Sequence, residues 1–308
     1  MIKIGTDCSG IEAPIEALKK ICNVYDLSFE HVFSSEIDKY ALQYIRDNHT
    51  PKIIFGDMTK RNIDDVPDID LYISGFPCQP FSRANKFKTT VDPRLNLFNN
   101  CLDVIQNKKP KIFILENVKT LVTLNDGKYF QEILSILKNL NIYDVYWKVI
   151  NSKDYGIPQC RDRLYIIGIQ KNLSKYNFEF PKKKQMRDIK EFIDLNDNTI
   201  MVKKECNYEL FNNIPNDSVF IDIGFRKAKF PNSNKWAPCI TAQPNMWCVS
   251  KNRKANIKEY LSLQGFPTED FVQNISDHQF KKKIGNSMTV DVIEELLIQC
   301  LKNINMII

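Results

Sequence analysis

Short apolar runs alternate with amphipathic stretches through the first half of the chain. The apolar runs are brief and rich in β-branched and aromatic residues, which predicts strands at residues 3–6, 31–35, 52–55, 71–74, 111–115, 145–150 and 164–169. Between them, apolar residues recur at helical spacing, which predicts helices at residues 13–21, 39–48, 95–107 and 130–140. This alternation predicts an α/β fold in which helices cover both faces of a mostly parallel sheet.

The pattern changes near residue 182. From there to about residue 258 the chain has short strand-like pieces, many asparagines and scattered charges, without a strand–helix repeat. Residues 290–303 again carry an apolar helical face, and we expect this helix to return to the large domain. The predicted organisation is a large domain at 1–181, a smaller irregular domain at 182–262, and a hinge with the final helix at 263–308.

Composition narrows the class of protein. The 308 residues are 43% hydrophobic and 26% charged, as in ordinary globular proteins. The nine cysteines form no Cys-x-x-Cys pair and the three histidines have no ligand-like spacing, which disfavours a disulfide scaffold and a metal centre. The sequence has no signal peptide and no apolar run of membrane-spanning length, so we expect a cytoplasmic protein with reduced cysteines. The net charge of +6 is compatible with a polyanionic partner.

Polar residues follow three of the predicted strands, at the edge of the sheet where ligands bind in open α/β folds. The turn at Gly10 opens a helix, and its backbone N–H groups suit an anionic group. Glu36 could accept hydrogen bonds from two ribose hydroxyls, while Asp57 could accept one from an adenine amine with Met58 against the ring. An ordinary turn and solvated acids are the alternatives. The predicted adenosine-type pocket comprises Asp7, Ser9, Gly10, Ile11, Glu36, Ile37, Asp57 and Met58.

A cysteine lies where the fourth predicted strand ends. Cys78 stands between Pro77 and Gln79, straight after the apolar run 71–74. The ring of Pro77 fixes its own φ and restricts Phe76, so the thiol lies on a stiff backbone. Cys78 is therefore a candidate nucleophile, although many free cysteines are simply buried in the core.

Charged residues follow two further strands. Glu116 follows the strand at 111–115, on the same predicted sheet edge as Cys78, where a carboxyl group could donate a proton or be structural. After Gln159, Arg161 and Arg163 are two positions apart and would point the same way in an extended segment. Two guanidinium groups on one face suit a phosphate or a base edge, while surface ion pairs with Asp162 are the alternative.

These motifs, in this order, resemble those of the cytosine-C5 DNA methyltransferase family. The matching segments are Pro77-Cys78-Gln79, Glu116-Asn117-Val118, Gln159 with Arg161 and Arg163, and Gly285-Asn286-Ser287. The chain departs from the family at Glu12 and Ala13, where glycines are common, and at Lys283, where many members carry glutamine.

The resemblance implies a Rossmann-like, S-adenosylmethionine-dependent methyltransferase sheet with a smaller target-recognition domain. It implies that Cys78 adds to C6 of a cytosine flipped out of duplex DNA, that Glu116 hydrogen-bonds N3 and the exocyclic amine, and that the two arginines favour the thiolate or the adduct. By the same resemblance, further cofactor contacts are Pro77, Leu97, Asn286 and Ser287, and DNA contacts are Ser82, Arg83 and Gln159. We expect a monomer without metal, and a cognate restriction endonuclease would act independently of it.

Two alternatives stay open from the sequence. Transfer-RNA cytosine-C5 methyltransferases share the Pro-Cys-Gln and Glu-Asn-Val motifs, and residues 92–96 have some resemblance to them, but their Cys-Phe-Thr signature is not found here. A catalytically silent nucleic-acid-binding protein is the second alternative. The joint presence of Cys78, Glu116, Arg161 and Arg163 disfavours it.

Overall fold

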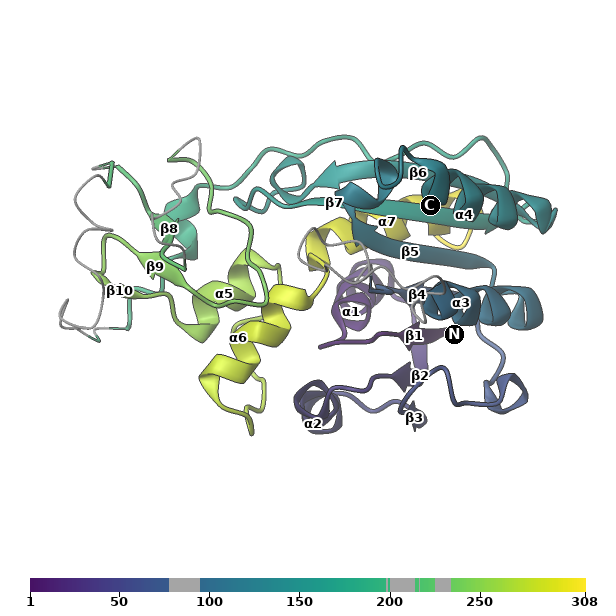
Figure 1. Cartoon of the computed structure of the whole chain (residues 1–308), viewed down its shortest axis with the longest axis horizontal. Coiled ribbons are helices and arrows are strands. Elements are labelled where there is room, and N and C mark those ends of the chain that lie inside the picture. The colour runs from purple at the N-terminus through teal and green to yellow at the C-terminus, as the bar shows by residue number, and fades with distance from the viewer. Residues whose placement is uncertain (78–94, 198, 200–213, 216, 225–233) are drawn as a thin grey trace. The chain divides into compact units, whose positions relative to one another are not determined.

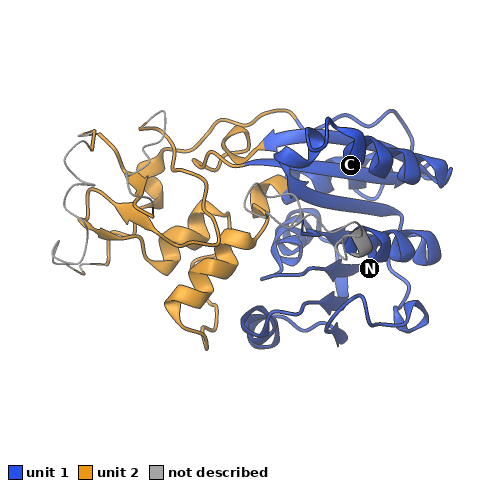
Figure 2. Ribbon diagram, in the orientation of Figure 1, with its two compact units in different colours: residues 1–150, 162–181, 293–308 blue, residues 151–161, 182–292 orange. Residues whose placement is uncertain are grey.

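The computed structural model describes two compact units. The described residues are all except 78–94, 198, 200–213, 216 and 225–233 (Figure 1). Unit 1 comprises residues 1–150, 162–181 and 293–308, and unit 2 comprises residues 151–161 and 182–292 (Figure 2).

Unit 1 is built on a seven-stranded sheet with the strand order β3-β2-β1-β4-β5-β7-β6. The strands are β1 (Ile2–Asp7), β2 (Phe29–Ser35), β3 (Ile53–Phe55), β4 (Leu71–Ser74), β5 (Ile112–Val118), β6 (Tyr143–Asn151) and β7 (Asp162–Gln170). The pairs from β3 to β5 are parallel, and β7 runs antiparallel to β5. The predicted mostly parallel sheet is confirmed, and the chain reverses its direction across the sheet between β1 and β4, where such folds bind ligands.

Helices pack on this sheet in two groups (Figure 1). They are α1 (Ala13–Tyr25), α2 (Lys39–Asn48), α3 (Leu95–Lys108), α4 (Lys128–Asn139) and α7 (Val290–Asn303). Buried side chains of α3 and α4 form one cluster with Phe33, Tyr72 and Phe113 from the sheet. In the other group, Lys20 of α1 lies 3.3 Å from Glu294 of α7. The predicted α/β fold with helices on both sides of the sheet is therefore confirmed.

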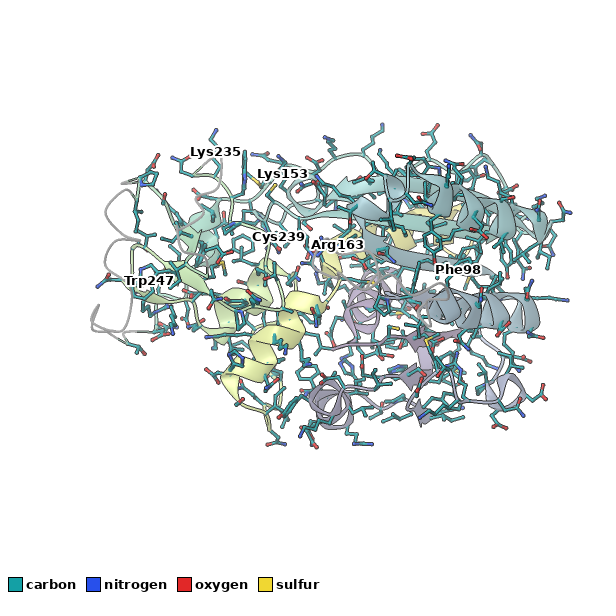
Figure 3. All side chains as sticks on the ribbon, viewed as in Figure 1. Phe98, Lys153, Arg163, Lys235, Cys239 and Trp247 are labelled. Carbon is teal, nitrogen blue, oxygen red and sulfur yellow. The ribbon has the colours of Figure 1, made fainter. Side chains whose placement is uncertain are left out.

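Unit 2 contains a small antiparallel sheet and two helices. The strands are β8 (Phe220–Asp222), β9 (Met246–Cys248) and β10 (Arg253–Lys254), in the order β10-β9-β8, and the helices are α5 (Ile257–Leu263) and α6 (Asp277–Asn286). Trp247 on β9 is only 1% exposed and anchors this sheet (Figure 3). The short strands agree with the irregular pattern of the sequence, whereas α6 was not predicted.

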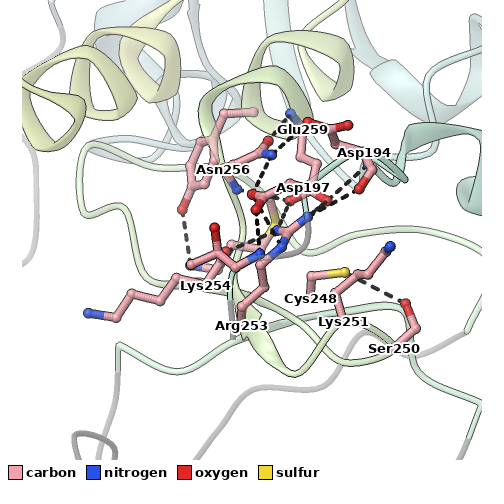
Figure 4. Close-up of polar contacts among 12 residues, drawn as sticks. Asp194, Asp197, Cys248, Ser250, Lys251, Arg253, Lys254, Asn256 and Glu259 are labelled. Carbon is pink, nitrogen blue, oxygen red and sulfur yellow. Dashed lines mark hydrogen bonds and ion pairs between the residues drawn. The ribbon is translucent and has the colours of Figure 1, made fainter. Parts of the chain in front are cut away.

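A buried polar network fixes the start of α5 (Figure 4). Arg253, 1% exposed, pairs with Glu259 at 2.8 and 2.9 Å and with Asp197 at 3.3 Å. The Asn256 side chain accepts from the Glu259 N–H, and Glu259 accepts from the Asn256 N–H, which forms a reciprocal capping box. Breaking one partner of such a buried pair costs about 3–5 kcal/mol, because the other charge stays buried alone. The network therefore ties α5 firmly to the segment at Asp197.

Candidate active site

The first strand ends of unit 1 bring Glu36 against the turn at Gly10. The Gly10 N–H donates to Glu36 Oε2 at 2.8 Å, and Glu36 Oε1 accepts from the N–H groups of Ile37 and Asp38, each at 2.8 Å. Gly10 has a φ of +57°, and no atom lies within 4 Å of the position that a Cβ would take. Ile37 beside it is 73% exposed. This corner thus combines a carboxylate, an open glycine turn and an uncovered apolar side chain.

The turn after β3 holds Asp57 in its charged form. Asp57 Oδ1 accepts from Thr59 Oγ1 at 2.7 Å and from its N–H at 3.0 Å, and these hydrogen bonds lower the pKa of the Asp57 carboxyl. Met58 is 5% exposed, with its sulfur 3.9 Å from the sulfur of Cys8. Asp57 is therefore an ionised acceptor, and the strand ends that carry it and Glu36 are neighbours in the sheet.

Three residues predicted to contact the cofactor have side chains that make contacts inside the protein. Both Asp7 oxygens are bound by Arg61, at 2.5 and 2.6 Å, and Ile11 is fully buried. The Ser9 hydroxyl accepts from the N–H of Ser35 at 2.9 Å. These contacts shape the turn, and a contact of Asp7, Ser9 and Ile11 with the cofactor stays a prediction.

Glu12 lies directly after the turn at Gly10 and is buried beneath it. Its side chain is fully buried and accepts from the hydroxyls of Thr6 at 2.8 Å and Ser34 at 2.6 Å. Burial raises the pKa of Glu12, but the hydrogen bond and charge of His31 outweigh it and leave that pKa below its ordinary value. An ionised carboxylate with its own polar partners thus lies beneath the turn.

The nucleophile candidate lies outside the described residues, as do Ser82 and Arg83. The described part of this segment ends at Pro77, and Phe76 is 4% exposed. Asn117 donates from Nδ2 to the Phe76 carbonyl at 2.9 Å, which anchors the backbone two residues before the cysteine.

Sequence reasoning did not assign Asn117 a role. In the sequence, the available signal was a polar residue just after an apolar strand. The structure buries Asn117 to 3% exposure, and a buried amide needs a hydrogen-bond partner. The ring centre of Phe98 in α3, which Figure 3 labels, lies 5.9 Å from that of Phe76. Leu97 is partly buried against the same apolar cluster, so α3 packs against the segment that contains Phe76.

Glu116 and Arg163 meet at the ends of β5 and β7. In the antiparallel register Glu116 faces Tyr165 and Val118 faces Arg163, so the acid and the arginine are diagonal neighbours on one face. Arg163 Nε lies 3.2 Å from Glu116 Oε1, and the two side chains are 17% and 12% exposed. The Glu116 side of this ion pair lies on β5. Strand β5 pairs with β4, and the chain continues from β4 toward Cys78.

Arg161 has a different environment, inside unit 2. It is 2% exposed, and its guanidinium donates to the carbonyls of Ile240 at 2.7 Å and Ser287 at 2.6 Å. Gln159 is fully buried; it donates to the Leu263 carbonyl at 2.6 Å and accepts from the Ile240 N–H at 3.0 Å. The two side chains hold separate backbone segments together. The catalytic role of Arg161 and the DNA contact of Gln159 stay predictions.

The Gly-Asn-Ser segment ends α6 in the same unit. A Cβ on Gly285 would lie 2.0 Å from the Thr241 carbonyl oxygen, so only glycine permits this approach of two backbones. Asn286 is exposed, while Ser287 is 7% exposed and its carbonyl is held by Arg161 and by Gln264 at 3.2 Å. The glycine and Arg161 therefore fix the backbone that presents Asn286.

Comparisons with known proteins agree with this arrangement. The model of the family described as C-5 cytosine-specific DNA methylase matches residues 6–302. Type II methyltransferase M.NgoBI of Neisseria gonorrhoeae is 39% identical over 274 residues, covering 86% of this chain and 84% of that protein. Type II methyltransferase M.HaeII of Haemophilus aegyptius is 37% identical over 284 residues, covering 90% of this chain and 87% of that protein.

Solved structures share the fold at lower identity. A protein encoded within an Escherichia coli prophage superposes with a TM-score of 0.76 at 18% identity, over 99% of this chain and all of that one. The S. pombe Dnmt2 methyltransferase superposes with a TM-score of 0.71, also at 18% identity and over 99% of this chain and all of that one.

The chain belongs to the C-5 cytosine-specific DNA methylase family, and it is a DNA cytosine-C5 methyltransferase. This supports the main interpretation of the sequence over the RNA and silent-protein alternatives. Within the described ranges, no group of three or more histidine, cysteine or acidic side chains could hold a metal ion. In the same part of the chain, every helix is too short or too polar to cross a bilayer.

Proposed function

We propose that this methyltransferase uses S-adenosyl-L-methionine and acts through a covalent adduct between Cys78 and cytosine. The observation that carries the proposal is the Glu116–Arg163 ion pair on β5 and β7, beside the strand that leads to Cys78. An acid, a cation and a candidate nucleophile thus originate from neighbouring strand ends. That is the set of groups needed to activate a weakly nucleophilic ring carbon.

The cofactor fits the donor set at the ends of β1 to β3. The two Glu36 oxygens suit the ribose hydroxyls, the ionised Asp57 suits the adenine amine, and the exposed Ile37 offers an apolar surface for the ring. The open side of Gly10 lets a ligand approach the backbone. When bound, S-adenosylmethionine supplies a methyl group on a sulfonium, to which an electron-rich C5 can bond. We also keep Pro77, Leu97, Asn286 and Ser287 as proposed contacts with its methionine end.

The protein groups drive the chemistry at the cytosine. The Cys78 thiolate forms a bond to C6, and the electron pair of the C5–C6 double bond moves to C5. Glu116 hydrogen-bonds N3 and the exocyclic amine, and Arg163, already beside it, stabilises the negative charge that develops on the ring. After methylation the C5 proton leaves to a base, the electron pair restores the double bond, and the sulfur–C6 bond breaks.

The substrate we propose is duplex DNA from which the target cytosine is flipped, because C5 and C6 are otherwise stacked inside the helix. Ser82 and Arg83 stay proposed DNA contacts. We assign target recognition to residues 182–262 and catalysis to residues 1–181, with residues 263–308 as hinge and returning helix. We further propose a monomer in the cytoplasm. As the Type II relatives suggest, its role would be to protect DNA from an endonuclease that acts independently.

A mechanism-based trap tests the proposal. A pool of random-sequence duplexes with 5-fluorocytosine in place of cytosine is incubated with the protein and S-adenosylmethionine. Fluorine cannot leave C5 as the proton does, so the enzyme should stop after methylation with the sulfur–C6 bond intact. We expect a protein–DNA adduct that survives denaturation and needs the cofactor. Failure to form one, or an adduct only with fluorinated RNA, would refute the mechanism on DNA.

The adenosine pocket makes a separate prediction. Glu36→Ala and Asp57→Ala should each weaken S-adenosylmethionine binding by about 1.5–3 kcal/mol, because each removes a hydrogen bond to a charged acceptor. The dissociation constant should rise about tenfold to more than hundredfold in isothermal titration calorimetry. Lys52→Ala is a matched control at the amino-terminal ends of the same two strands, because it removes an ion pair between a 63% exposed Lys52 and a 19% exposed Glu30. Unaltered binding in both pocket variants would contradict the assignment.

A further inference from the structure

Arg61 lies among the strand ends that form the proposed cofactor pocket. Its Nη1 and Nη2 are 2.5 and 2.6 Å from the two carboxylate oxygens of Asp7, and Nη1 is also 3.1 Å from the Ser35 hydroxyl. The Arg61 side chain is 6% exposed and that of Asp7 is fully buried. The planar guanidinium therefore forms a two-pronged ion pair with the end of β1 and a hydrogen bond with the end of β2.

Aromatic rings hold the same guanidinium in place. It lies 5.2 Å from the ring centre of Phe33 on β2 and 5.3 Å from that of Phe55 on β3. Tyr72 on β4 donates at 2.6 Å to Asp7 Oδ2, the oxygen that Arg61 Nη2 also binds, and so adds a second anchor to the acid. Arg61 thus contacts the ends of three adjacent strands directly and a fourth through Asp7, with a geometry that lysine could not reproduce.

The segment between Asp57 and Arg61 is otherwise held by a local turn and by the buried side chain of Met58. It follows β3, a strand of three partly buried residues at the edge of the sheet. The Lys60 N–H donates to the Asp57 carbonyl at 3.0 Å, which closes a turn, and the sulfur of Met58 lies 3.9 Å from that of Cys8. Arg61 therefore supplies the strong polar attachment of this turn to the sheet.

We infer that Arg61 is a positioning residue, which sets where Asp57 stands relative to Glu36 and so decides how well the pocket selects an adenine amine. The inference rests on the proposed use of S-adenosylmethionine. Stability alone does not account for the ion pair, because well-packed apolar side chains can replace a buried ion pair without loss of stability. The Ser35 hydroxyl, bound by Arg61, also lies 3.4 Å from the Gly56 carbonyl, so Arg61 contacts both strand ends that carry the two acids.

The selectivity of the protein for the adenine amine distinguishes a positioning role of Arg61 from a role in stability alone. Calorimetry compares S-adenosylhomocysteine, the product of methyl transfer, with its 6-deamino analogue, in which hydrogen replaces the amino group. The unaltered protein should bind the first at least about tenfold more tightly, the value of one charge-assisted hydrogen bond. In Arg61→Met and Arg61→Lys this ratio should fall to about threefold or less, because Asp57 is no longer held at the amine.

Two further variants control for stability. Arg61→Met leaves Asp7 buried without its partner and could unfold, so the triple variant Asp7→Leu, Arg61→Met, Tyr72→Phe removes the whole polar cluster at once. It should retain a cooperative thermal transition and still lose the selectivity. Leu137→Ala, a fully buried side chain of α4, should lower the thermal midpoint while the selectivity ratio is unchanged.

The outcomes distinguish this inference from the proposed function. If the unaltered protein fails to bind S-adenosylhomocysteine, or does not select the amine, the proposed pocket is wrong and the inference falls with it. If the unaltered protein selects the amine and the Arg61 variants select it equally well, the pocket stands and the positioning role of Arg61 is refuted. Loss of selectivity in Leu137→Ala would also overturn the inference, because general destabilisation would then suffice.

Discussion

Cys78→Ser is expected to reduce methylation of DNA by at least about a thousandfold, because a hydroxyl is far less ionised than a thiol at neutral pH and is a much poorer nucleophile. The change is nearly isosteric and follows Pro77, whose backbone geometry does not depend on the sulfur. S-adenosylmethionine binding and the thermal midpoint should therefore stay close to those of the unaltered protein. Transfer of a labelled methyl group to duplex DNA measures the loss.

Other cysteines provide the control for this prediction. Cys22 lies in α1 and is buried at 6% exposure, away from the strand ends, and burial raises the pKa of its thiol. Cys22→Ser should retain methylation and can lower stability only modestly. A Cys78→Ser variant that kept more than about a tenth of the turnover would remove this cysteine from the mechanism.

The sheet could be predicted from the sequence because the apolar runs have the length of strands and the stretches between them have the apolar spacing of helices. Runs such as 71–74 and 111–115 are too short for helices, and the stretches between strands have clear helical faces. The same method missed α6 because its surface is highly charged, so little periodicity is visible at 281–283. A local signal was nevertheless present. Ser276 precedes the helix, and its hydroxyl accepts from the Gln279 N–H at 3.5 Å, as an N-cap does.

The positions of candidate site residues could be predicted where these residues directly follow a strand. Glu36, Asp57 and Glu116 follow strands that the pattern located, so their shared edge of the sheet followed from topology. The sequence did not show that Arg161 and Arg163 have different environments. Their two-residue spacing suggested a common face. Arg161, however, lies just before the start of β7, and its buried guanidinium donates to backbone carbonyls of unit 2.

Long-range partners are what the sequence could not supply. Arg61 and Asp7 are far apart in the chain, and nothing in the local pattern relates the turn after β3 to the end of β1. Asn117 was visible only as part of a motif until its bond to the Phe76 carbonyl gave it a physical role. In both cases a buried polar group had to have a partner, but the sequence did not identify which one.

Glu116→Gln is expected to slow the chemical step by about 10²–10⁴-fold, the usual contribution of a positioned acid or base. Glutamine keeps the shape of the side chain but cannot hold the charge paired with Arg163 at 3.2 Å, and it cannot exchange a proton with the cytosine ring. Because Glu116 lies at the end of β5 and the proposed adenosine pocket at the ends of β1 to β3, cofactor affinity should change by less than about threefold. Single-turnover kinetics at saturating S-adenosylmethionine isolates this step.

The neighbouring ion pair on the same strands provides the matched control. Asp162 starts β7 and pairs with Lys119 just after β5, with side chains 29% and 58% exposed. Asp162→Asn removes a carboxylate by the same kind of change, only one residue from Arg163, and exposed pairs of this kind contribute little to stability. We expect its single-turnover rate to match that of the unaltered enzyme. If Glu116→Gln weakens cofactor binding while leaving the chemical step unchanged, or if Asp162→Asn slows that step equally, Glu116 does not act on the cytosine.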